Sequence, residues 1–270
     1  MREATSSEAL APRHDRLGSI SHFAKRSGKA VARALRKLRR DLVRNLDRET
    51  VARLYLKGIG IEIGALHEPL RVPKSVVVRY VDRMSTPDLR RHYPELASVN
   101  LVNVHIIDDG ERLATVSNES QDFVIANQVL EHCANPLFAL ENMLRVLKVG
   151  GILYLSLPDK RYSFDVDRPV TPIAHVLRDY REGPEWSKRQ HFEEWVRCVE
   201  HLSGAAFTER VEALMRIDYS IHYHVWTQLE MLELLGAAAG LVGHFEIELF
   251  LRTDYDVEHL IILRKTAPRG

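Results

Sequence analysis

Between residues 59 and 157 the sequence alternates short apolar runs with stretches that favour helix or turn. The apolar runs are IGIEI (59–63), VVVRYV (76–81), LVNVHII (101–107), DFVIA (122–126) and GILYLSL (151–157). Apolar runs of this length are typical of strands that are buried on both faces of a sheet. Strands that alternate with helices indicate an α/β domain whose sheet is mainly parallel and covered on both faces.

The clearest helical pattern is NPLFALENMLRVLKVGG (135–151). We expect Asn135 to cap this helix, Pro136 to occupy its first turn, and Gly150 and Gly151 to end it. Its leucines recur at helical spacing and predict one buried face.

The alternation resumes near the C-terminus. A helix is predicted over 228–239 with Thr227 as its N-cap, and the apolar runs HFEIELFL (244–251) and VEHLIILR (257–264) follow. Only a short turn separates the last two runs, which predicts an antiparallel pair at the C-terminal edge of the sheet. The sheet would then contain seven strands.

Two regions stand apart from this pattern. Residues 1–56 are predicted to hold a polar tail, a basic helix over 23–46 and a second helix that Asp47 caps. Residues 57–270 form the main domain, in which an insertion at about 160–226, rich in charged and aromatic residues, is expected to be a helical cap. The basic helix is expected to pack through its leucines or to lie on an anionic membrane surface. Nucleic-acid binding is not expected, because no aromatic residues interleave with the charges.

Composition excludes several classes of protein. The net charge is only +1, so the chain as a whole is not a polyanion binder. Its two cysteines, Cys133 and Cys198, have no paired spacing, which argues against a disulfide framework and favours a reducing compartment. The N-terminus lacks the apolar segment of a secretory signal, and no stretch approaches the roughly 20 apolar residues that span a membrane. A cytoplasmic location is therefore expected.

The stretch KGIGIEIGALHEPLRVPKSVVVRYVDRMS (57–85) indicates a nucleoside site. Glu62 and Gly64 stand at the end of the first strand, and Asp82 ends the second strand, where its carboxylate can accept hydrogen bonds from a ribose diol. Dinucleotide sites need several glycines for the pyrophosphate, whereas Leu66 and Glu68 occupy that approach here. The loop therefore favours a nucleoside ligand without phosphate, such as S-adenosylmethionine, whose cationic sulfonium nearby carboxylates would favour.

The stretch DFVIANQVLEHCANPLFALENMLRVLKVGGILYLSLPDK (122–160) resembles class I S-adenosylmethionine-dependent methyltransferases, and within them the bacterial type 11 group. The resemblance implies a Rossmann-like methyltransferase fold. Two departures are visible: the glycine-rich loop keeps one glycine, and Val149 replaces a common proline. The cofactor-binding residues that the resemblance implies are Glu62, Gly64, Ala65, Asp82, Asp108 or Asp109 at the adenine, Asn127, Gln128 and His132.

The acceptor side is less defined. Methyl transfer to a hydroxyl oxygen needs a general base, and we expect His222 or His224, oriented by Asp159, to supply it. A metal held by the two histidines with Asp159 or Asp165, and a purely structural role, are the alternatives, and no metal site is assigned. His132 is expected to pack beside the cofactor rather than to act as base.

The expected reaction is methyl transfer from S-adenosylmethionine to a small-molecule or glycan acceptor, at a hydroxyl oxygen. The alternatives are methyl transfer to nitrogen or carbon of another metabolite, and a cofactor-binding domain without activity. The oxygen is favoured because no Asn/Asp-Pro-Pro-Tyr/Phe motif follows the fourth strand, where ANQVLEH (126–132) stands instead.

Overall fold

The computed structural model describes residues 46–96, 98–253 and 257–268. The predicted basic helix 23–46 and its membrane contact lie, apart from Leu46, outside the described residues. The compact main unit begins at Asp47. The reason is that helix α2 (Arg48–Tyr55) packs on this unit, where Val51 and Ala52 are fully buried.

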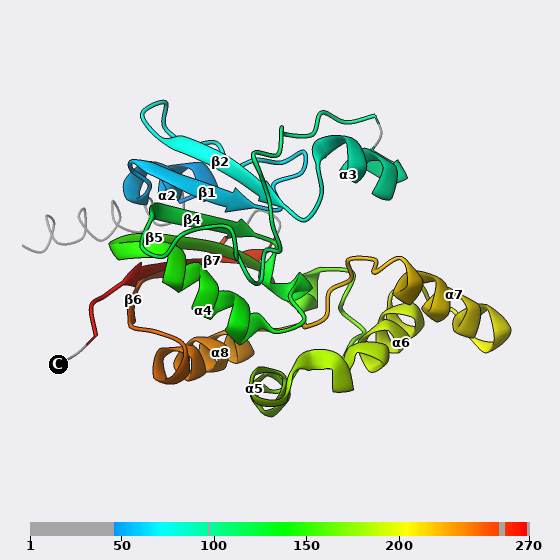
Figure 1. Cartoon of the computed structure of the whole chain (residues 1–270). Helices are drawn as coiled ribbons and strands as arrows, with labels where there is room; N and C mark the ends of the chain where they lie inside the picture. The colour runs from blue at the N-terminus through cyan, green and yellow to red at the C-terminus, as the bar shows by residue number, and fades with distance from the viewer. Residues whose placement is uncertain (1–45, 97, 254–256, 269–270) are drawn as a thin grey trace, which may run out of the picture. The chain divides into compact units, whose positions relative to one another are not determined.

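Seven strands form one sheet in the order β3-β2-β1-β4-β5-β7-β6. Strand β7 is antiparallel to both its neighbours, β5 and β6, and the other pairs are parallel. The predicted mainly parallel, seven-stranded Rossmann-like sheet with an antiparallel C-terminal pair is therefore confirmed (Figure 1). The strands are β1 (Ile59–Ile63), β2 (Val77–Asp82), β3 (Ile106–Ile107), β4 (Gln121–Asn127), β5 (Leu147–Pro158), β6 (Phe245–Arg252) and β7 (Glu258–Lys265).

The third strand is much shorter than the predicted run 101–107. Its first residues have their hydrogen-bond partners outside the sheet: the amide of Val102 donates to the carbonyl of Leu66, and that of Val104 to the Thr86 hydroxyl. The apolar run 101–107 therefore lies outside the sheet over most of its length, and only its last two residues are paired with β2 as a strand.

The predicted helix N-caps Asn135 and Thr227 are confirmed. Asn135 accepts a hydrogen bond from the amide of Phe138 at the start of α4 (Pro136–Val146), and Thr227 forms a capping box with Glu230 at the start of α8 (Gln228–Leu241). The predicted end of α4 is wrong. The helix ends at Val146, and Gly150, at φ +84°, lies in a bulge of β5 between residues that pair with β4.

Alternating side chains of β5 contact different layers. Leu153, Leu155 and Leu157 join the main core with leucines of α4 and α8, whereas the Tyr154 hydroxyl donates to the carbonyl of Arg48 in α2. Helix α2 and the pair α4 and α8 therefore cover opposite faces of the sheet, as Figure 1 shows. Among the described residues, no helix combines the length and apolar character needed to cross a membrane.

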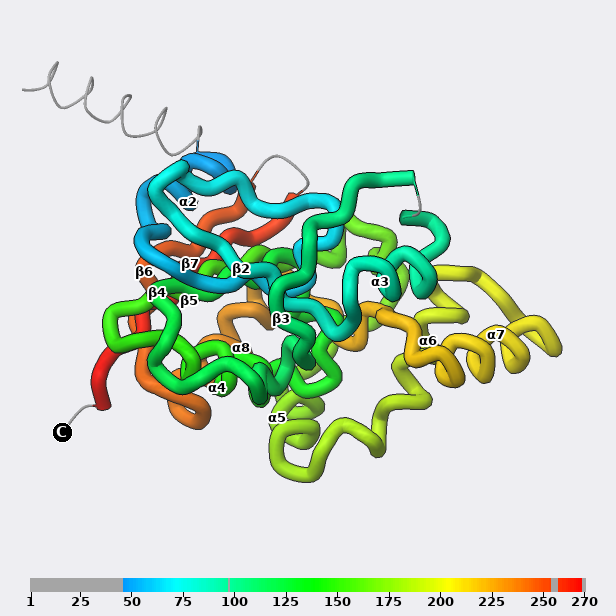
Figure 2. The backbone as a smooth tube through the Cα atoms, turned by 45° about the horizontal axis from the view of Figure 1, so that its top comes forward, coloured from blue at the N-terminus to red at the C-terminus, as the bar shows by residue number. Residues whose placement is uncertain are grey.

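The predicted cap is helical and has its own core. Its helices are α5 (Ile173–Glu182), α6 (Lys188–Cys198) and α7 (Gly204–Arg216), and an extended segment, 219–226, leads from them to α8. Phe192, Val196, Val211 and Leu214 are buried together with Ile221 of this segment. Figures 1 and 2 place α6 and α7 beyond the carboxyl ends of the central strands. The remaining elements are α3 (Thr86–His92) and the 3₁₀ turns η1 (Pro94–Leu96), η2 (Leu130–His132), η3 (Lys160–Tyr162) and η4 (Pro184–Trp186).

Gly60 gives a test of the sheet. A Cβ at this position of β1 would collide with the carbonyl oxygen and ring of Phe123 in β4, so the two backbones must separate. We expect Gly60→Ala to lower the free energy of unfolding by about 1–3 kcal/mol in a urea titration.

Gly236 is the matched control, because a Cβ there meets no atom within 4 Å in the exposed face of α8. Gly236→Ala should leave stability unchanged or raise it by up to about 1 kcal/mol. Equal stability of the two variants would contradict the close approach of β1 and β4.

Candidate functional site

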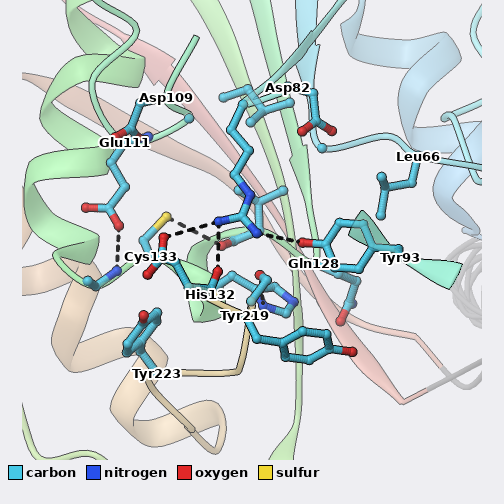
Figure 3. A pocket seen from close by; sticks show the side chains of 18 of the residues that line it. Leu66, Asp82, Tyr93, Asp109, Glu111, Gln128, His132, Cys133, Tyr219 and Tyr223 are labelled. Carbon is cyan, nitrogen blue, oxygen red and sulfur yellow. Dashed lines mark hydrogen bonds and ion pairs between the residues drawn. The ribbon is translucent and has the colours of Figure 1, made fainter. Parts of the chain in front are cut away.

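A cavity of about 640 Å³ opens where the order of the strands reverses, between β1 and β4. The carboxyl ends of β1, β2, β3 and β4 supply one side, and the cap supplies the other (Figure 3). This is the crevice in which open α/β sheets bind their ligands. The residues that line it and that the sequence predicted are Gly64, Asp82, Asp108, Asp109, Gln128 and His132.

The loop after β1 keeps the backbone turn of a glycine-rich loop with one glycine. Gly64 has φ +64° and Leu66 φ +47°, so a leucine adopts the left-handed conformation that favours glycine. The Leu66 side chain lines the cavity. No helix follows before β2, since residues 64–76 include Pro69 and Pro73. The loop therefore offers a phosphate neither a helix N-terminus nor an open backbone.

Glu62 supports this loop rather than facing the cavity. One of its carboxylate oxygens accepts a hydrogen bond of 2.9 Å from the amide of Leu70, and the other is buried with no partner among the residues that the structure describes. Burial raises the pKa of Glu62 to about 7. Glu62 does not line the cavity, and neither does Ala65, which accepts a backbone hydrogen bond from Glu68.

Acidic side chains dominate the edge of the cavity near β2 and β3. Asp82 ends β2, and burial raises the pKa of its carboxyl group. Asp108 is occupied by its own loop, because one oxygen accepts hydrogen bonds from the amide and hydroxyl of Thr115. Asp109 lies beside it and is about half exposed; one oxygen accepts a hydrogen bond from the amide of Glu111, and the other lies 3.9 Å from Arg112. Of the two adenine candidates, Asp109 therefore has the freer carboxylate.

The two cofactor-binding residues predicted at the end of β4 have different positions. Gln128, at φ +54°, lines the cavity, and its side-chain amide donates to Glu258. In the described part of the chain, neither the oxygen nor the nitrogen of the buried Asn127 amide has a partner, and this residue does not line the cavity. Asn127 is thus close in sequence to the site but turned away from the cavity.

His132 lines the cavity and has a defined tautomer. Its Nδ1 lies 2.9 Å from the carbonyl oxygen of Ile221, and a carbonyl can only accept, so Nδ1 carries the proton and Nε2 the lone pair. Burial, and next the neighbouring His222, lower the pKa of His132 to about 3. The imidazole is therefore neutral at physiological pH. Beside it Glu131 is fully buried, and neither of its carboxylate oxygens has a partner among the described residues. Burial raises the pKa of Glu131 to about 7.

His222 lies behind His132 and does not line the cavity. Its ring makes an edge contact with the ring of His132 at a centroid distance of 4.5 Å, and its Nδ1 lies 2.7 Å from Asp165. Asp165 in turn accepts from the fully buried guanidinium of Arg168. The expectation that Asp159 orients this histidine is therefore wrong, because Asp165 has that position.

Asp159 and His224 belong to other networks. Asp159 accepts hydrogen bonds from Arg161 and lies 3.2 Å from His259. Burial acts to raise the pKa of Asp159, but the hydrogen bonds from Arg161 outweigh it and bring the pKa to about 2. His224 is fully buried, 3.3 Å from the carbonyl oxygen of Ala134 and 3.7 Å from Asp179. The structure therefore does not bring both His222 and His224 together with Asp159 or Asp165, and the metal site considered from the sequence is not formed.

Sequence reasoning missed the residues that close the cavity. Arg83 follows Asp82 directly, and its guanidinium donates to the Tyr93 hydroxyl and to Asp218 of the cap. The Tyr219 hydroxyl donates to Glu95, which lies in the segment after α3. These contacts join the cap to the segment that follows β2, and only the presence of Arg83 beside a predicted strand end could have pointed to them.

The lining fits S-adenosylmethionine. Asp82 stands where a ribose diol needs an acceptor, and the acidic edge favours a cationic sulfonium. The lining cations Arg83 and Lys188 both pair with Asp218 of the cap. The volume lies within the range of about 300–1,000 Å³ that is usual for small-molecule sites.

One comparison with known families agrees with this picture. Residues 63–155 match the family model described as a methyltransferase domain. A comparison with curated proteins gives no match.

Among solved structures, a Rhodobacter sphaeroides protein described as a Zn-dependent alcohol dehydrogenase is similar over 83% of this chain and 92% of its own, at 15% identity and a TM-score of 0.51. That likeness shows the fold alone. An S-adenosylmethionine-dependent methyltransferase from Aquifex aeolicus is similar over 78% of this chain and 83% of its own, at 12% identity and a TM-score of 0.40. One from Methanosarcina mazei is similar over 82% and 94%, at 16% identity and a TM-score of 0.39.

Asp82 provides the first test of the site. Asp82→Ala should weaken S-adenosylhomocysteine binding by at least about tenfold in calorimetry, because it removes a charged hydrogen-bond acceptor. Asp167→Ala is the control, since Asp167 is exposed and does not line the cavity. An unchanged affinity of Asp82→Ala, or wild-type protein that prefers NAD to S-adenosylhomocysteine, would contradict the assignment.

Glu62 provides a test that depends on pH. Its raised pKa means that the folded state holds a proton that the unfolded state has already released, so its contribution to stability falls as pH rises from about 4.5 to about 7. Glu62→Gln keeps an acceptor for Leu70 without the charge. Between pH 5 and pH 8, the free energy of unfolding of this variant should rise by up to about 3 kcal/mol relative to that of the wild type, as measured by urea unfolding.

The exposed Glu233 of α8 is the control: within the described residues it forms no ion pair, so Glu233→Gln should change stability equally at both pH values. A Glu62→Gln variant whose stability follows the wild type across this range would show that Glu62 is ionised in the folded state at pH 5.

Proposed function

We propose that this chain, which is a class I S-adenosylmethionine-dependent methyltransferase, transfers the methyl group to a hydroxyl oxygen of a small polar molecule or glycan fragment. The observation that carries the proposal is the composition of the cavity. Its strand-end side is acidic, and its cap side carries hydroxyl groups.

The two sides suit two ligands. Gly64, Asp82, Asp109 and Gln128 lie at the strand ends, where the cofactor of such a fold binds. The cap and the segment after β2 contribute a second set of groups that can hydrogen-bond a hydroxylated acceptor: Tyr93, Tyr219, Ser220 and Tyr223. Aromatic rings with polar tips also suit the alternating apolar and hydroxylated faces of a sugar.

S-adenosylmethionine, when bound, supplies the activated methyl group, and the chain must remove the proton of the acceptor hydroxyl. His132 has the position for that step, because it lines the cavity and holds its lone pair on Nε2. Its lowered pKa keeps the imidazole neutral at physiological pH, so Nε2 holds its lone pair, and the same shift makes this imidazole a weaker base than an ordinary histidine.

The surroundings of His132 can hold a transient positive charge. Burial and His222 lower the pKa of His132, the charge of Asp165 offsets part of this lowering, and the buried Glu131 has a carboxylate oxygen within 4.8 Å of one His132 ring nitrogen. His222 then serves as a positioning residue, because it packs edge-on against His132 and is itself fixed by Asp165. This assignment replaces His222 and His224 as the base, since neither of them lines the cavity.

The reaction is tested with defined pools of acceptors. Full-length protein should release S-adenosylhomocysteine when given hydroxylated metabolites or glycan fragments, and the product should carry the new methyl group on oxygen by mass spectrometry and NMR. Turnover with amines alone would refute the choice of oxygen. Intact cofactor binding without turnover in any pool would favour a binding domain instead.

His132 is tested by substitution. His132→Gln should lower kcat by roughly 10²–10⁴-fold, because the amide cannot accept a proton, while S-adenosylhomocysteine affinity stays within a few-fold of the wild type. His201→Asn is the control, since His201 is exposed on the cap and its φ of +55° suits asparagine. A His132→Gln enzyme with the wild-type rate would remove His132 from the mechanism and leave proximity as the source of the rate.

A further inference from the structure

We propose that His175, Asp179, His191 and His224 bind a structural Zn²⁺ ion inside the cap. These four side chains come from three segments, α5, α6 and the extended segment 219–226. Each offers one ligand atom, and all four atoms lie within 4.8 Å of one another. The set is separate from the cavity, because none of the four lines it.

The distances fit a tetrahedral ion. Zinc binds imidazole nitrogen and carboxylate oxygen at about 2.0–2.2 Å, so neighbouring ligand atoms of a tetrahedron lie about 3.3 Å apart. His175 Nε2 lies 3.1 Å from His191 Nε2 and 3.2 Å from Asp179 Oδ2. His224 Nε2 lies 3.7 Å from the same carboxylate oxygen and 3.3 Å from the carbonyl oxygen of Ala134, so it must release its proton and this hydrogen bond to bind the ion. Small side-chain movements would therefore complete the coordination.

The burial of the cluster favours a bound cation. Asp179 and His224 are fully buried, and the side chain of His175 is only 16% exposed. Within the described residues, Asp179 Oδ2 has no hydrogen-bond donor, although it faces imidazole nitrogens from two segments. An unpaired buried carboxylate oxygen is costly, and a divalent ion among neutral imidazoles would satisfy it.

The chain presents the four ligands in an ordered way. His175 and Asp179 are four residues apart on α5, so they lie on one face of that helix. The second oxygen of Asp179 accepts from the Ser187 hydroxyl at 3.2 Å, which orients the carboxylate as partners of metal ligands do. Four protein ligands in a buried place make a closed site, which is typical of structural rather than catalytic zinc.

The ion would fasten the cap to the wall of the methyl-transfer cavity. The segment 219–226 lines that cavity through Tyr219, Ser220 and Tyr223, and His224 follows directly. Coordination by α5 and α6 would therefore fix the acceptor side. The inference rests on the cluster itself and does not depend on which acceptor is methylated.

The test measures metal in the whole chain without an affinity tag. After dialysis against EDTA, wild-type protein should retain one Zn²⁺ per chain by mass spectrometric metal analysis. Asp179→Asn and His191→Gln should retain less than about a tenth of that, whereas the control His201→Asn should match the wild type. Removing the zinc with a stronger chelator should lower Tm by at least about 5 °C, and Zn²⁺ but not Mg²⁺ should restore it.

Replacement of the ion by Co²⁺ gives a readout that needs no variant, since tetrahedral Co²⁺ has strong visible absorption bands. These bands should appear in the wild type. Metal-free wild type whose Tm does not respond to Zn²⁺ would overturn the proposal and favour a network in which His175 bonds to His191 and His224 donates to Ala134. Zinc that remains in folded Asp179→Asn and His191→Gln would also overturn it, because the ion would then lie elsewhere.

Discussion

The parallel pairing of β1 with both β2 and β4 is the constraint on which the site depends. Gly60 allows β1 and β4 to approach, and the register sets Glu62 opposite Tyr80 on one side and Ile125 on the other. Three strands thereby end at one edge, so the groups that follow them must meet. The cavity is a consequence of this pairing, and the loops that follow the strands decide which ligand it suits.

The strand-end residues could be predicted because their positions follow from local sequence. β1 was predicted to the residue, and its neighbours to within a few residues, since short apolar runs mark buried strands. Gly64, Asp82, Asp109 and Gln128 then line the cavity by virtue of chain position alone. The exceptions also have local causes: Glu62 turns inward to hold Leu70, and the glycines after α4 serve a bulge that pairing with β4 imposes.

The acceptor side could not be predicted in the same way, because its contacts join residues far apart in the sequence. His222 meets Asp165 across 57 residues, and Asp159 meets His259 across 100. A period of two along 222–224 suggests that both histidines face one ligand, yet each has a different partner. Sequence spacing fixes which residues can share an element, whereas the packing of the cap on η2 decides which of them share a site.

The cap differs from the sheet in what holds it to its neighbours. The sheet is held by leucine, isoleucine and valine, but the cap also buries Arg168, which bonds to Asp165 and to the backbone carbonyls of His222 and Tyr223. Charged groups of this kind are costly to bury unless every one is paired, and they tolerate little displacement. The segment 219–226 is therefore held in one arrangement by directional bonds. That arrangement places Ser220 and the carbonyl of Ile221 against Nδ1 of His132, so the rigidity of the cap also sets the tautomer of the histidine that faces the cavity.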